Sequence, residues 1–245
     1  MQLVFDFPVI PRYSFDNFVV SSGNRTAFEF ARRLTDVDTG ESILYIYGPP
    51  GSGKTHLLRA IGGCFPAGAG GLPHLSCGAL VGLTGGESPE RESSLVERFH
   101  GASVLLIDDI DLLPDQRQLR EGIWHLFNEF YQSGRKIVVT GAVPPRELAT
   151  VDDHLISRLL WGLVARVDVS DDDSRCLILK KLAEDRQIVL PDDVITYLLF
   201  HSRRDVHSLI AAFTALARQA LATGRKISVR LAREALGGGE APDPR

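Results

Sequence analysis

Ile-Leu-Tyr-Ile-Tyr-Gly-Pro-Pro-Gly-Ser-Gly-Lys-Thr, residues 43–55, is the stretch that decides the fold. Its first five residues are apolar or aromatic and predict a buried strand, and a helical pattern follows from Thr55. Glycines in such a loop let backbone N–H groups close around a polyphosphate, Lys54 is expected to reach the β- and γ-phosphates, and the Thr55 hydroxyl is expected to ligate Mg²⁺. A glycine-rich turn that matches by chance is the alternative, but it requires neither a strand before it nor a helix after it. The residues that fit the pattern G-x-x-x-x-G-K-[ST] are Gly48, Pro49, Pro50, Gly51, Ser52, Gly53, Lys54 and Thr55.

A second apolar strand, predicted over 104–107, ends in two acids, Asp108 and Asp109. We expect Asp108 to bind the Mg²⁺ ion and Asp109 to act as the base that polarises a water molecule. Two acids at the end of a strand also occur as a solvated turn or as the N-cap of the next helix. The phosphate loop upstream favours the interpretation as a nucleotide site.

Short β-rich runs alternate with helical patterns up to residue 169, which predicts an α/β fold with a parallel sheet flanked by helices. The remaining strands are expected over 75–80, 137–140 and 164–169, and helices over 24–34 and 116–132. The strands are almost continuous in Val, Ile and Leu, as in sheets that are covered on both faces. After residue 169 the periodicity is helical, with capping acids at 171–173 and an apolar repeat of three and four residues from Asp205.

These patterns divide the chain into an N-terminal tail (1–12), an α/β nucleotide-binding domain (13–169), a small all-helical domain (170–237) and a flexible tail (238–245). The glycine-rich residues 62–90 are expected to be mostly loops. Trp124 and Trp161 lie among apolar residues, so we expect both to pack in the core or between the domains.

The composition is that of an ordinary globular protein, with 245 residues, of which 44% are hydrophobic and 24% are charged. The formal net charge is −4, whereas a protein that lives mainly on nucleic acid is usually basic, because it has to neutralise phosphates. Three widely spaced cysteines indicate neither disulfides nor a structural zinc site. With no signal peptide and no apolar run of membrane-spanning length in the sequence, we expect a cytoplasmic protein.

Together these motifs resemble the AAA+ ATPases, and within them the DnaA family of bacterial replication initiators and its short regulatory relatives of the Hda type. The resemblance covers nearly the whole chain. Besides the phosphate loop and the acidic strand, it rests on three segments. They are residues 13–25 (Tyr-Ser-Phe-Asp-Asn-Phe-Val-Val-Ser-Ser-Gly-Asn-Arg), residues 137–141 (Ile-Val-Val-Thr-Gly) and residues 155–162 (Leu-Ile-Ser-Arg-Leu-Leu-Trp-Gly).

The resemblance implies bound ATP or ADP with Mg²⁺, and possible self-association through AAA+ interfaces. Arg158 matches the family's arginine finger, which serves the nucleotide of a neighbouring subunit, although a surface ion pair is the alternative. Outside the phosphate loop, the resemblance adds an adenine-binding box, a sensor 1 region and a lid of helices. Their matching residues are Val19, Val20, Asn24, His56, Thr140 and His207.

Four departures from the initiator pattern narrow this interpretation. The chain stops after the lid, so no sequence-specific DNA binding is expected, and the segment after the phosphate loop is shorter than the family's DNA-contacting region. Ala142 replaces the polar sensor 1 residue, and His207 replaces the sensor 2 arginine. A neutral histidine holds a γ-phosphate less firmly than an arginine does. We therefore expect nucleotide binding with weak or absent intrinsic hydrolysis.

The N-terminal residues Gln2, Leu3, Phe5 and Phe7 resemble the short Gln-Leu motif with which bacterial proteins dock on the sliding clamp of DNA polymerase III. In that mode Leu3 and a phenylalanine fill apolar pockets while Gln2 forms a hydrogen bond at the rim. An edge strand that packs on the protein's own sheet is the alternative.

The leading functional prediction is a regulator of replication initiation. It would be a nucleotide-bound adaptor, docked on the sliding clamp, that stimulates hydrolysis of ATP held by the DnaA initiator by presenting Arg158 in trans. The alternative is an initiation or loading factor with its own ATPase activity that contacts single-stranded DNA at origins. A small-molecule P-loop kinase fits poorly, because the paired acids, the Arg158 segment and the helical lid have no part in it.

Overall fold

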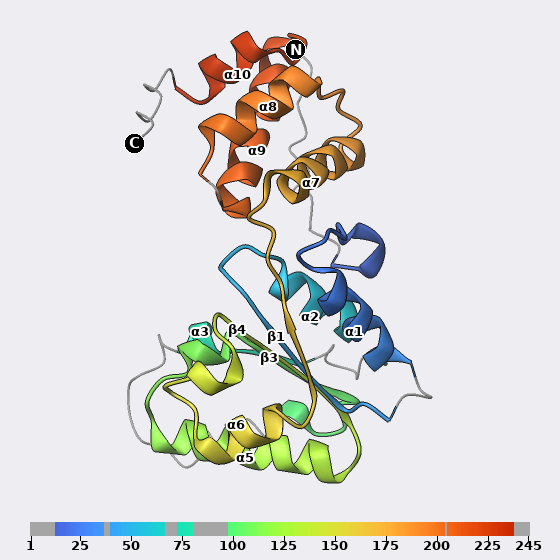
Figure 1. Ribbon diagram of the computed structural model, residues 1–245, viewed down its shortest axis with the longest axis vertical. Helices are drawn as coiled ribbons and strands as arrows, with labels where there is room; N and C mark the ends of the chain where they lie inside the picture. Colours follow the sequence, from blue (N-terminus) through green and yellow to red (C-terminus); the bar gives the residue numbers. More distant parts are fainter. Residues whose placement is uncertain (1–12, 37–39, 67–72, 81–97, 204, 238–245) are drawn as a thin grey trace.

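Five parallel strands in the order β2-β3-β4-β1-β5 form one sheet in the computed structural model. The structure describes residues 13–36, 40–66, 73–80, 98–203 and 205–237. The predicted parallel sheet is therefore confirmed, and its helices are shown in Figure 1. The strands are Ile43–Tyr47 (β1), His74–Ser76 (β2), Val104–Asp108 (β3), Lys136–Gly141 (β4) and Leu163–Arg166 (β5).

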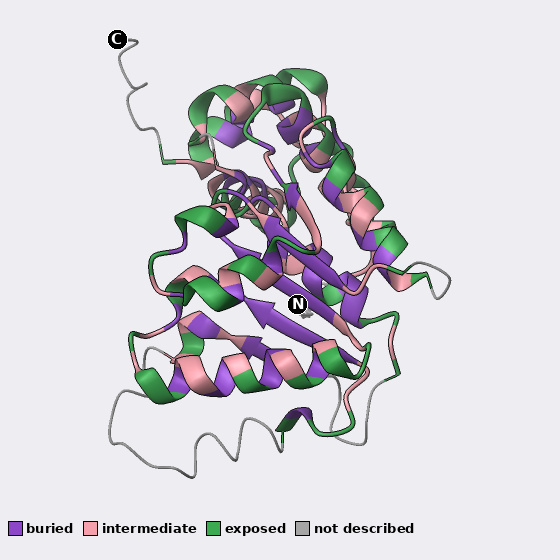
Figure 2. Cartoon of the chain, turned by 60° about the horizontal axis from the view of Figure 1, so that its bottom comes forward, coloured by how far each residue is buried: buried purple, intermediate pink, exposed green. Residues whose placement is uncertain are grey.

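Helices cover both faces of this sheet. Successive side chains of a strand point to opposite faces, so a strand that is apolar throughout has an apolar side on each face to bury. Tyr45 and Leu105 belong to a core shared with α5 (Arg117–Gln132) and α6 (Asp153–Leu159). Their neighbours Leu44 and Leu106 belong to a second core, shared with α1 (Arg25–Thr35) and α2 (Lys54–Gly62). Figure 2 shows the strands as a buried layer between the helices. Burial on both faces explains why the strands are apolar at almost every position.

Two predicted strands end earlier than expected. β2 ends at Ser76, which pairs with Asp108 at the end of β3. Beyond that pair, no strand of the described ranges lies alongside, and the chain turns into the short helix α3 (Cys77–Leu80). β5 ends at Arg166, although the Val167 N–H still donates to the Tyr47 carbonyl. The other three strands agree with the prediction to within one residue at each end.

In the described part of the chain after residue 171, the helices and the turns between them include no strand, as the periodicity predicts. They are α7 (Asp172–Asp185), α8 (Asp192–His201), α9 (Val206–Thr223) and α10 (Val229–Ala235), and they share an apolar core of their own. Asp171 and Asp205 cap α7 and α9, since each carboxylate accepts a hydrogen bond from the backbone N–H three residues later. Figure 1 shows this helical group beyond one end of the α/β part. The expected domain boundaries themselves stay a prediction.

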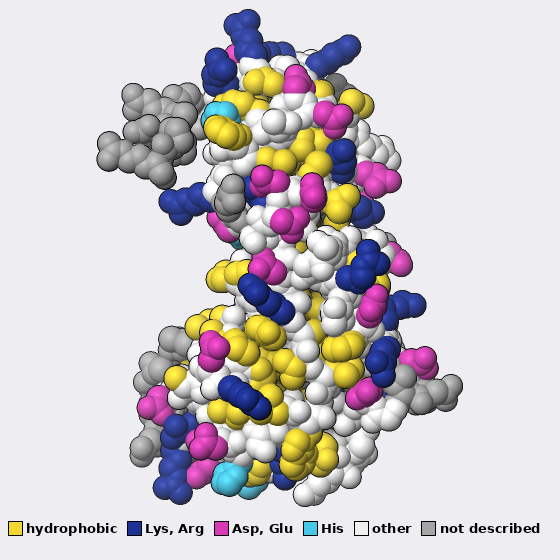
Figure 3. Space-filling model, viewed as in Figure 1, with side chains coloured by type: hydrophobic (Ala, Val, Ile, Leu, Met, Phe, Trp, Pro, Cys, Tyr) yellow, Lys and Arg dark blue, Asp and Glu magenta, His cyan; other side chains and the backbone are white. Residues whose placement is uncertain are grey.

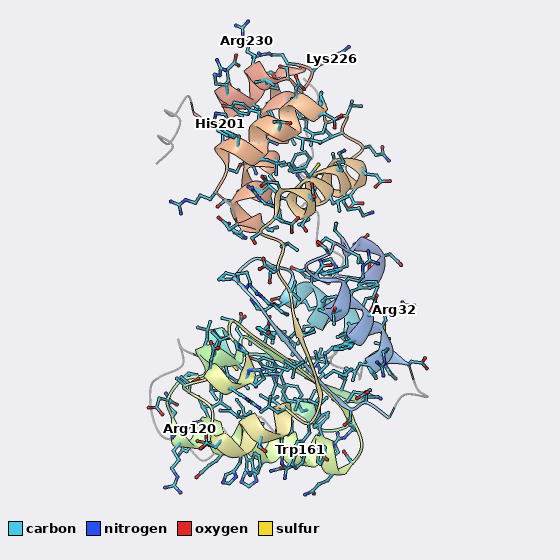
Figure 4. All side chains as sticks on the ribbon, in the orientation of Figure 1. Arg32, Arg120, Trp161, His201, Lys226 and Arg230 are labelled. Carbon is cyan, nitrogen blue, oxygen red and sulfur yellow. The ribbon has the colours of Figure 1, made fainter. Side chains whose placement is uncertain are left out.

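The surface carries mixed charge over most of the face shown in Figure 3. Lys and Arg side chains gather at the outer end of the helical group, where Arg225, Lys226 and Arg230 are exposed (Figure 4). Both arginines pair with Glu234. None of the helices in the described ranges is both long and apolar enough to cross a membrane. The predicted clamp-docking residues Gln2, Leu3, Phe5 and Phe7 lie outside the described residues.

Candidate nucleotide site

The phosphate loop connects the end of β1 to the start of α2. Gly51 and Gly53 adopt φ values of +75° and +103°, a left-handed conformation that glycine tolerates best. Lys54 is 6% exposed, and its Nζ donates hydrogen bonds to the carbonyl oxygens of Gly48 (2.9 Å) and Pro49 (3.1 Å). The loop is therefore closed around its own ammonium group.

This loop fits a bound polyphosphate. The first N–H groups of α2 have no partner within the helix, and they add the positive end of the helix dipole. Among the residues that the structure describes, the buried Ser52 hydroxyl has no hydrogen-bond partner. Buried polar groups are normally paired, so an unpaired hydroxyl beside an ammonium group and a helix N-terminus matches a site built for an anion.

Asp108 lies in the middle of a hydrogen-bonded cluster. Its carboxylate accepts from the Thr55 hydroxyl at 2.9 Å and from the Thr140 hydroxyl at 2.5 Å. Burial alone raises the pKa of Asp108, but the hydrogen bonds from Thr140 and Thr55 and the nearby His74 ring outweigh burial and lower it. The residue predicted to bind Mg²⁺ is thus ionised and only 4% exposed, and it faces the predicted threonine ligand.

Asp109 differs from its neighbour in conformation and electrostatics. Its φ is +54°, and its backbone N–H donates to the Thr140 hydroxyl oxygen at 2.9 Å. Burial and the negative charge of Asp108 raise the pKa of the Asp109 carboxyl, while Lys54 acts in the opposite direction. A raised pKa suits a group that exchanges a proton with water. Thr140 orients both acids, because its single proton is donated to Asp108 and its oxygen accepts from the Asp109 N–H. Its role in binding the nucleotide stays a prediction.

The sequence interpretation missed two further residues of this cluster. His74 on β2 has its Nε2 3.6 Å from the Asp108 carboxylate. Asp111, just after the acids, accepts a hydrogen bond from the Ala142 N–H at 2.7 Å and so fixes the loop that follows β4. The pairing of β2 with β3 is what brings His74 here, and a sequence without an assigned strand order gives no signal of it.

The predicted adenine-binding box lies against the phosphate loop. Phe18 approaches Gly53 so closely that an added Cβ would lie 3.1 Å from its ring. Asn24 is buried and stabilises the turn that precedes it. Its Oδ1 accepts a hydrogen bond from the Ser21 N–H, and its Nδ2 donates one to the Val19 carbonyl oxygen. Val19 and Val20, both half-buried, follow Phe18 directly. The Phe18 ring thus places the box at the loop, and the Asn24 side chain holds its turn together.

His56, also predicted to bind the nucleotide, contacts the residues of this box, and its role in binding stays a prediction. Its ring makes edge contacts with Tyr13 and Phe18, and its Nε2 lies 2.9 Å from the Ser14 carbonyl oxygen. Burial lowers the pKa of the imidazole, partly offset by the bond to Ser14. In the structure His56 anchors the N-terminal segment on α2.

The lid meets the phosphate loop at His207. A Cβ added to Gly51 would lie 3.4 Å from the His207 backbone nitrogen, so the N-terminus of α9 touches the loop. The His207 side chain is exposed. The structure therefore brings the predicted sensor 2 position to the predicted phosphate site, although the two are far apart in sequence.

Arg158 lies on the opposite face of the sheet from Lys54. It belongs to α6, whereas Lys54 begins α2 on the other face. Gly162, just after α6, packs on Ile43 at the start of β1. Because Gly48 follows the other end of β1, about 16 Å of extended strand separates these points. Arg158 is not part of the cluster around Lys54.

Trp124 and Trp161 both lie beside Arg158. Trp124 packs partly against the core, but Trp161 is 61% exposed, so the prediction of a buried Trp161 was wrong. The Trp161 side chain is labelled in Figure 4. Its ring is tilted against that of Tyr131, with the ring centres 5.8 Å apart, and lies beside the Arg158 guanidinium.

Solved structures resemble this fold over almost the full chain. Domain III of the Thermotoga maritima replication initiation protein DnaA superposes with a TM-score of 0.79 at 28% identity, covering 95% of this chain and 98% of that one. AMPPCP-bound DnaA from Aquifex aeolicus gives a TM-score of 0.70 at 26% identity, over 86% of this chain and 67% of that one. RuvB of Thermotoga maritima, at 17% identity and a TM-score of 0.67, shares the fold alone. The sheet, the loop and the helical lid define the AAA+ class of P-loop proteins.

Family models narrow the class further. Residues 9–68 and 88–166 match the bacterial DnaA ATPase domain, so the chain belongs to this family. Residues 172–236 match the lid domain of Hda. Chromosomal replication initiator proteins DnaA from Geobacter sulfurreducens and Caldanaerobacter subterraneus are 32% and 30% identical, each over 92% of this chain. The chain spans about half the length of these curated relatives, 52% in both cases.

Proposed function

We propose that this chain is an Hda-like regulator of replication initiation. It is a nucleotide-bound adaptor that docks on the sliding clamp and stimulates hydrolysis of ATP bound to the DnaA initiator. Arg158 acts in trans on the initiator's nucleotide, where its positive charge offsets the charge that develops on the transferring phosphoryl group.

The position of Arg158 is the observation that carries this proposal. The arginine lies on α6, across the sheet from the chain's own phosphate loop, and on a partly exposed surface. Its charge is therefore available to a nucleotide on another subunit. The match of residues 172–236 to the Hda lid supports the regulatory branch of the family.

The chain's own site is suited to holding ATP or ADP with Mg²⁺. Lys54 and the loop N–H groups would hold the phosphates, Thr55 and Asp108 the metal ion, and the box around Asn24 the base. The nucleotide, when bound, adds negative charge between the phosphate loop and the lid, which His207 brings together. Binding is thereby expected to hold lid and sheet in one arrangement.

Self-contained hydrolysis is expected to be weak. Ala142 offers no polar side chain at the sensor position, and His207 is not a permanent cation. The Thr140 hydroxyl, the nearest polar alternative, already donates to Asp108. Regulation through Arg158 does not require the chain's own nucleotide site to hydrolyse ATP.

Docking on the clamp rests on the N-terminal motif Gln2, Leu3, Phe5 and Phe7 alone. With the clamp as its anchor, the chain would act at replisomes in the cytoplasm. Recognition through a short apolar motif agrees with the net charge of −4, which does not favour direct binding to DNA.

The experiment is a reconstitution with DNA-loaded clamp and ATP-bound DnaA initiator. Wild-type protein should accelerate hydrolysis of the initiator's ATP by about 10-fold or more, and Arg158→Ala should remove the acceleration. The matched control is Arg117→Ala, which removes an exposed arginine of α5 that pairs with Glu121. The double variant Gln2→Ala, Leu3→Ala should abolish the acceleration, because the proposal requires docking on the clamp. An unchanged acceleration with Arg158→Ala rejects the proposal, and ATP hydrolysis by this chain alone favours the initiation-factor alternative.

A further inference from the structure

The guanidinium of Arg158 is surrounded by three aromatic rings and one amide. Its Cζ lies 4.7 Å from the ring centre of Trp124, 5.4 Å from that of Tyr131 and 5.7 Å from that of Trp161. Its Nη1 donates a hydrogen bond to the Asn128 Oδ1. Each of these rings is within the range of a cation–π interaction.

Three of these four contacts come from one face of α5. Trp124, Asn128 and Tyr131 follow each other at steps of four and three residues, so they lie in a row along the helix. α5 is anchored in the core by Ile123, Phe127 and Phe130, all fully buried. A helix that is anchored by its buried face thus presents this row to α6, where Arg158 lies.

All four groups around Arg158 are uncharged, which sets it apart from Arg135 and Arg117 on the same side of the sheet. Arg135 also lies over a ring, that of Phe130, but it pairs with Glu129 at 2.6 Å. Arg117 pairs with Glu121 at 2.7 Å. Within the described residues, no carboxylate forms an ion pair with Arg158. Aromatic faces and an amide oxygen can fix the direction of a guanidinium without neutralising it.

We propose that Trp124, Asn128 and Tyr131 are positioning residues, which hold the half-buried Arg158 side chain in one orientation while leaving its charge free for an anion on another subunit. This inference rests on the proposed trans role of Arg158. A free arginine side chain loses considerable rotational entropy when it is fixed in one orientation. Because the row on α5 already restricts the Arg158 side chain before the partner binds, little of this entropy is lost on binding. More of the interaction energy with the phosphoryl group then lowers the barrier to hydrolysis.

The contact between Arg158 and the row on α5 is tested without any partner protein, by NMR of the full chain labelled with ¹⁵N-arginine. Protons that lie over aromatic rings are shifted upfield by ring currents. The Arg158 Hε signal, assigned by its loss in Arg158→Lys, should lie upfield of exposed arginines and move towards them in Trp124→Leu. Trp124→Phe, which keeps a ring, should retain most of the shift. An Arg158 signal at the position of exposed arginines in the wild type overturns the proposal.

The functional arm measures initiator ATP hydrolysis against the concentration of this chain. Trp124→Leu should lower the maximal stimulated rate about three- to tenfold and leave the half-saturating concentration within about twofold, with Trp124→Phe close to wild type. A purely structural role would lower the rate only as far as it lowers the folded fraction, which circular dichroism measures. Equal rates for the Leu and Phe variants overturn the proposal.

Asn128→Asp provides a nearly isosteric test of the uncharged surroundings. The carboxylate would still accept the Arg158 hydrogen bond, and as an ion pair it would hold the arginine at least as firmly. We expect the maximal stimulated rate to fall nonetheless, because the charge is neutralised, while Asn128→Ser has a smaller effect. A rate equal to wild type in Asn128→Asp overturns the requirement for a free charge. If the wild-type chain gives no stimulation at all, the proposed function fails, and the NMR result alone then decides whether the row holds Arg158.

Discussion

The Thr55 hydroxyl and the Asp108 carboxylate meet at 2.9 Å although 53 residues separate them in the sequence. Thr55 lies in the first turn of α2 and Asp108 at the end of β3. Both therefore lie at the carboxyl edge of a parallel sheet, where ligands of open α/β folds bind. A metal ion placed between them would find one hydroxyl and one ionised carboxylate, the oxygen ligands that Mg²⁺ prefers.

Asp108→Asn should uncouple nucleotide binding from Mg²⁺. Removal of the charge should weaken ATP binding in the presence of Mg²⁺ by about 10- to 100-fold, and binding in EDTA should change little. Titration with a fluorescent ATP analogue, with and without Mg²⁺, measures both affinities. Asp115→Asn, at an acid with a side chain that is 80% exposed, is the control and should behave as wild type. A variant that still gains affinity from Mg²⁺ would place the metal elsewhere.

His207→Arg should strengthen the hold of the lid on the nucleotide. The backbone of His207 already touches the phosphate loop at Gly51, so a permanent cation there would lie near the phosphates. We expect ATP affinity to rise about 5- to 20-fold, and ADP affinity to rise less, because ATP carries the extra γ-phosphate. His201→Arg makes the same substitution at an exposed position at the end of α8 (Figure 4) and should change neither affinity. Equal gains for ADP and ATP would argue against contact with the γ-phosphate.

The stability of the fold should decrease in mild acid, in part through His56. Burial lowers the folded-state pKa of His56 below its ordinary 6.5, so between these two values the unfolded chain binds a proton that the folded chain does not. The stabilisation is complete above pH 6.5 and is lost as the pH falls through the folded pKa. Urea unfolding at pH 7.5, 6.5 and 5.5 should show a flatter dependence for His56→Gln than for wild type. His100→Gln, at an exposed position, should keep the wild-type slope, and an equal slope in His56→Gln would contradict the assignment.

Gly162→Ala should destabilise the α/β part. An added Cβ would lie 2.5 Å from both the carbonyl oxygen and the Cβ of the buried Ile43, directly before the point where β1 and β5 begin to pair. Because β1 and β5 cannot separate without breaking their hydrogen bonds, we expect a loss of about 2–3 kcal/mol in the free energy of unfolding. Gly40→Ala, where nothing lies within 4 Å, should cost less than about 0.5 kcal/mol. Similar unfolding midpoints for the two variants would show that the strands move apart readily.

Local patterns in the sequence were enough to predict the elements that carry the site. The phosphate loop, the acidic strand and the caps at Asp171 and Asp205 all depend on neighbouring residues, and the structure places each on the predicted kind of element. The ends of β2 and β5 could not be predicted in this way. A strand ends where its neighbour ends, and the neighbour of Ser76 is a residue of β3.

What the sequence determined by itself was the class of fold and the chemistry of the phosphate loop, because backbone conformation and hydrophobic periodicity are properties of adjacent residues. What only the tertiary structure decided was which side chains meet. The partner of Asp108 turned out to be His74 as well as Thr55, the hydroxyl of Thr140 was committed to the acids, and Arg158 was surrounded by uncharged groups of α5. These contacts depend on strand order and on the face of the sheet that each helix covers, and a linear pattern does not contain either.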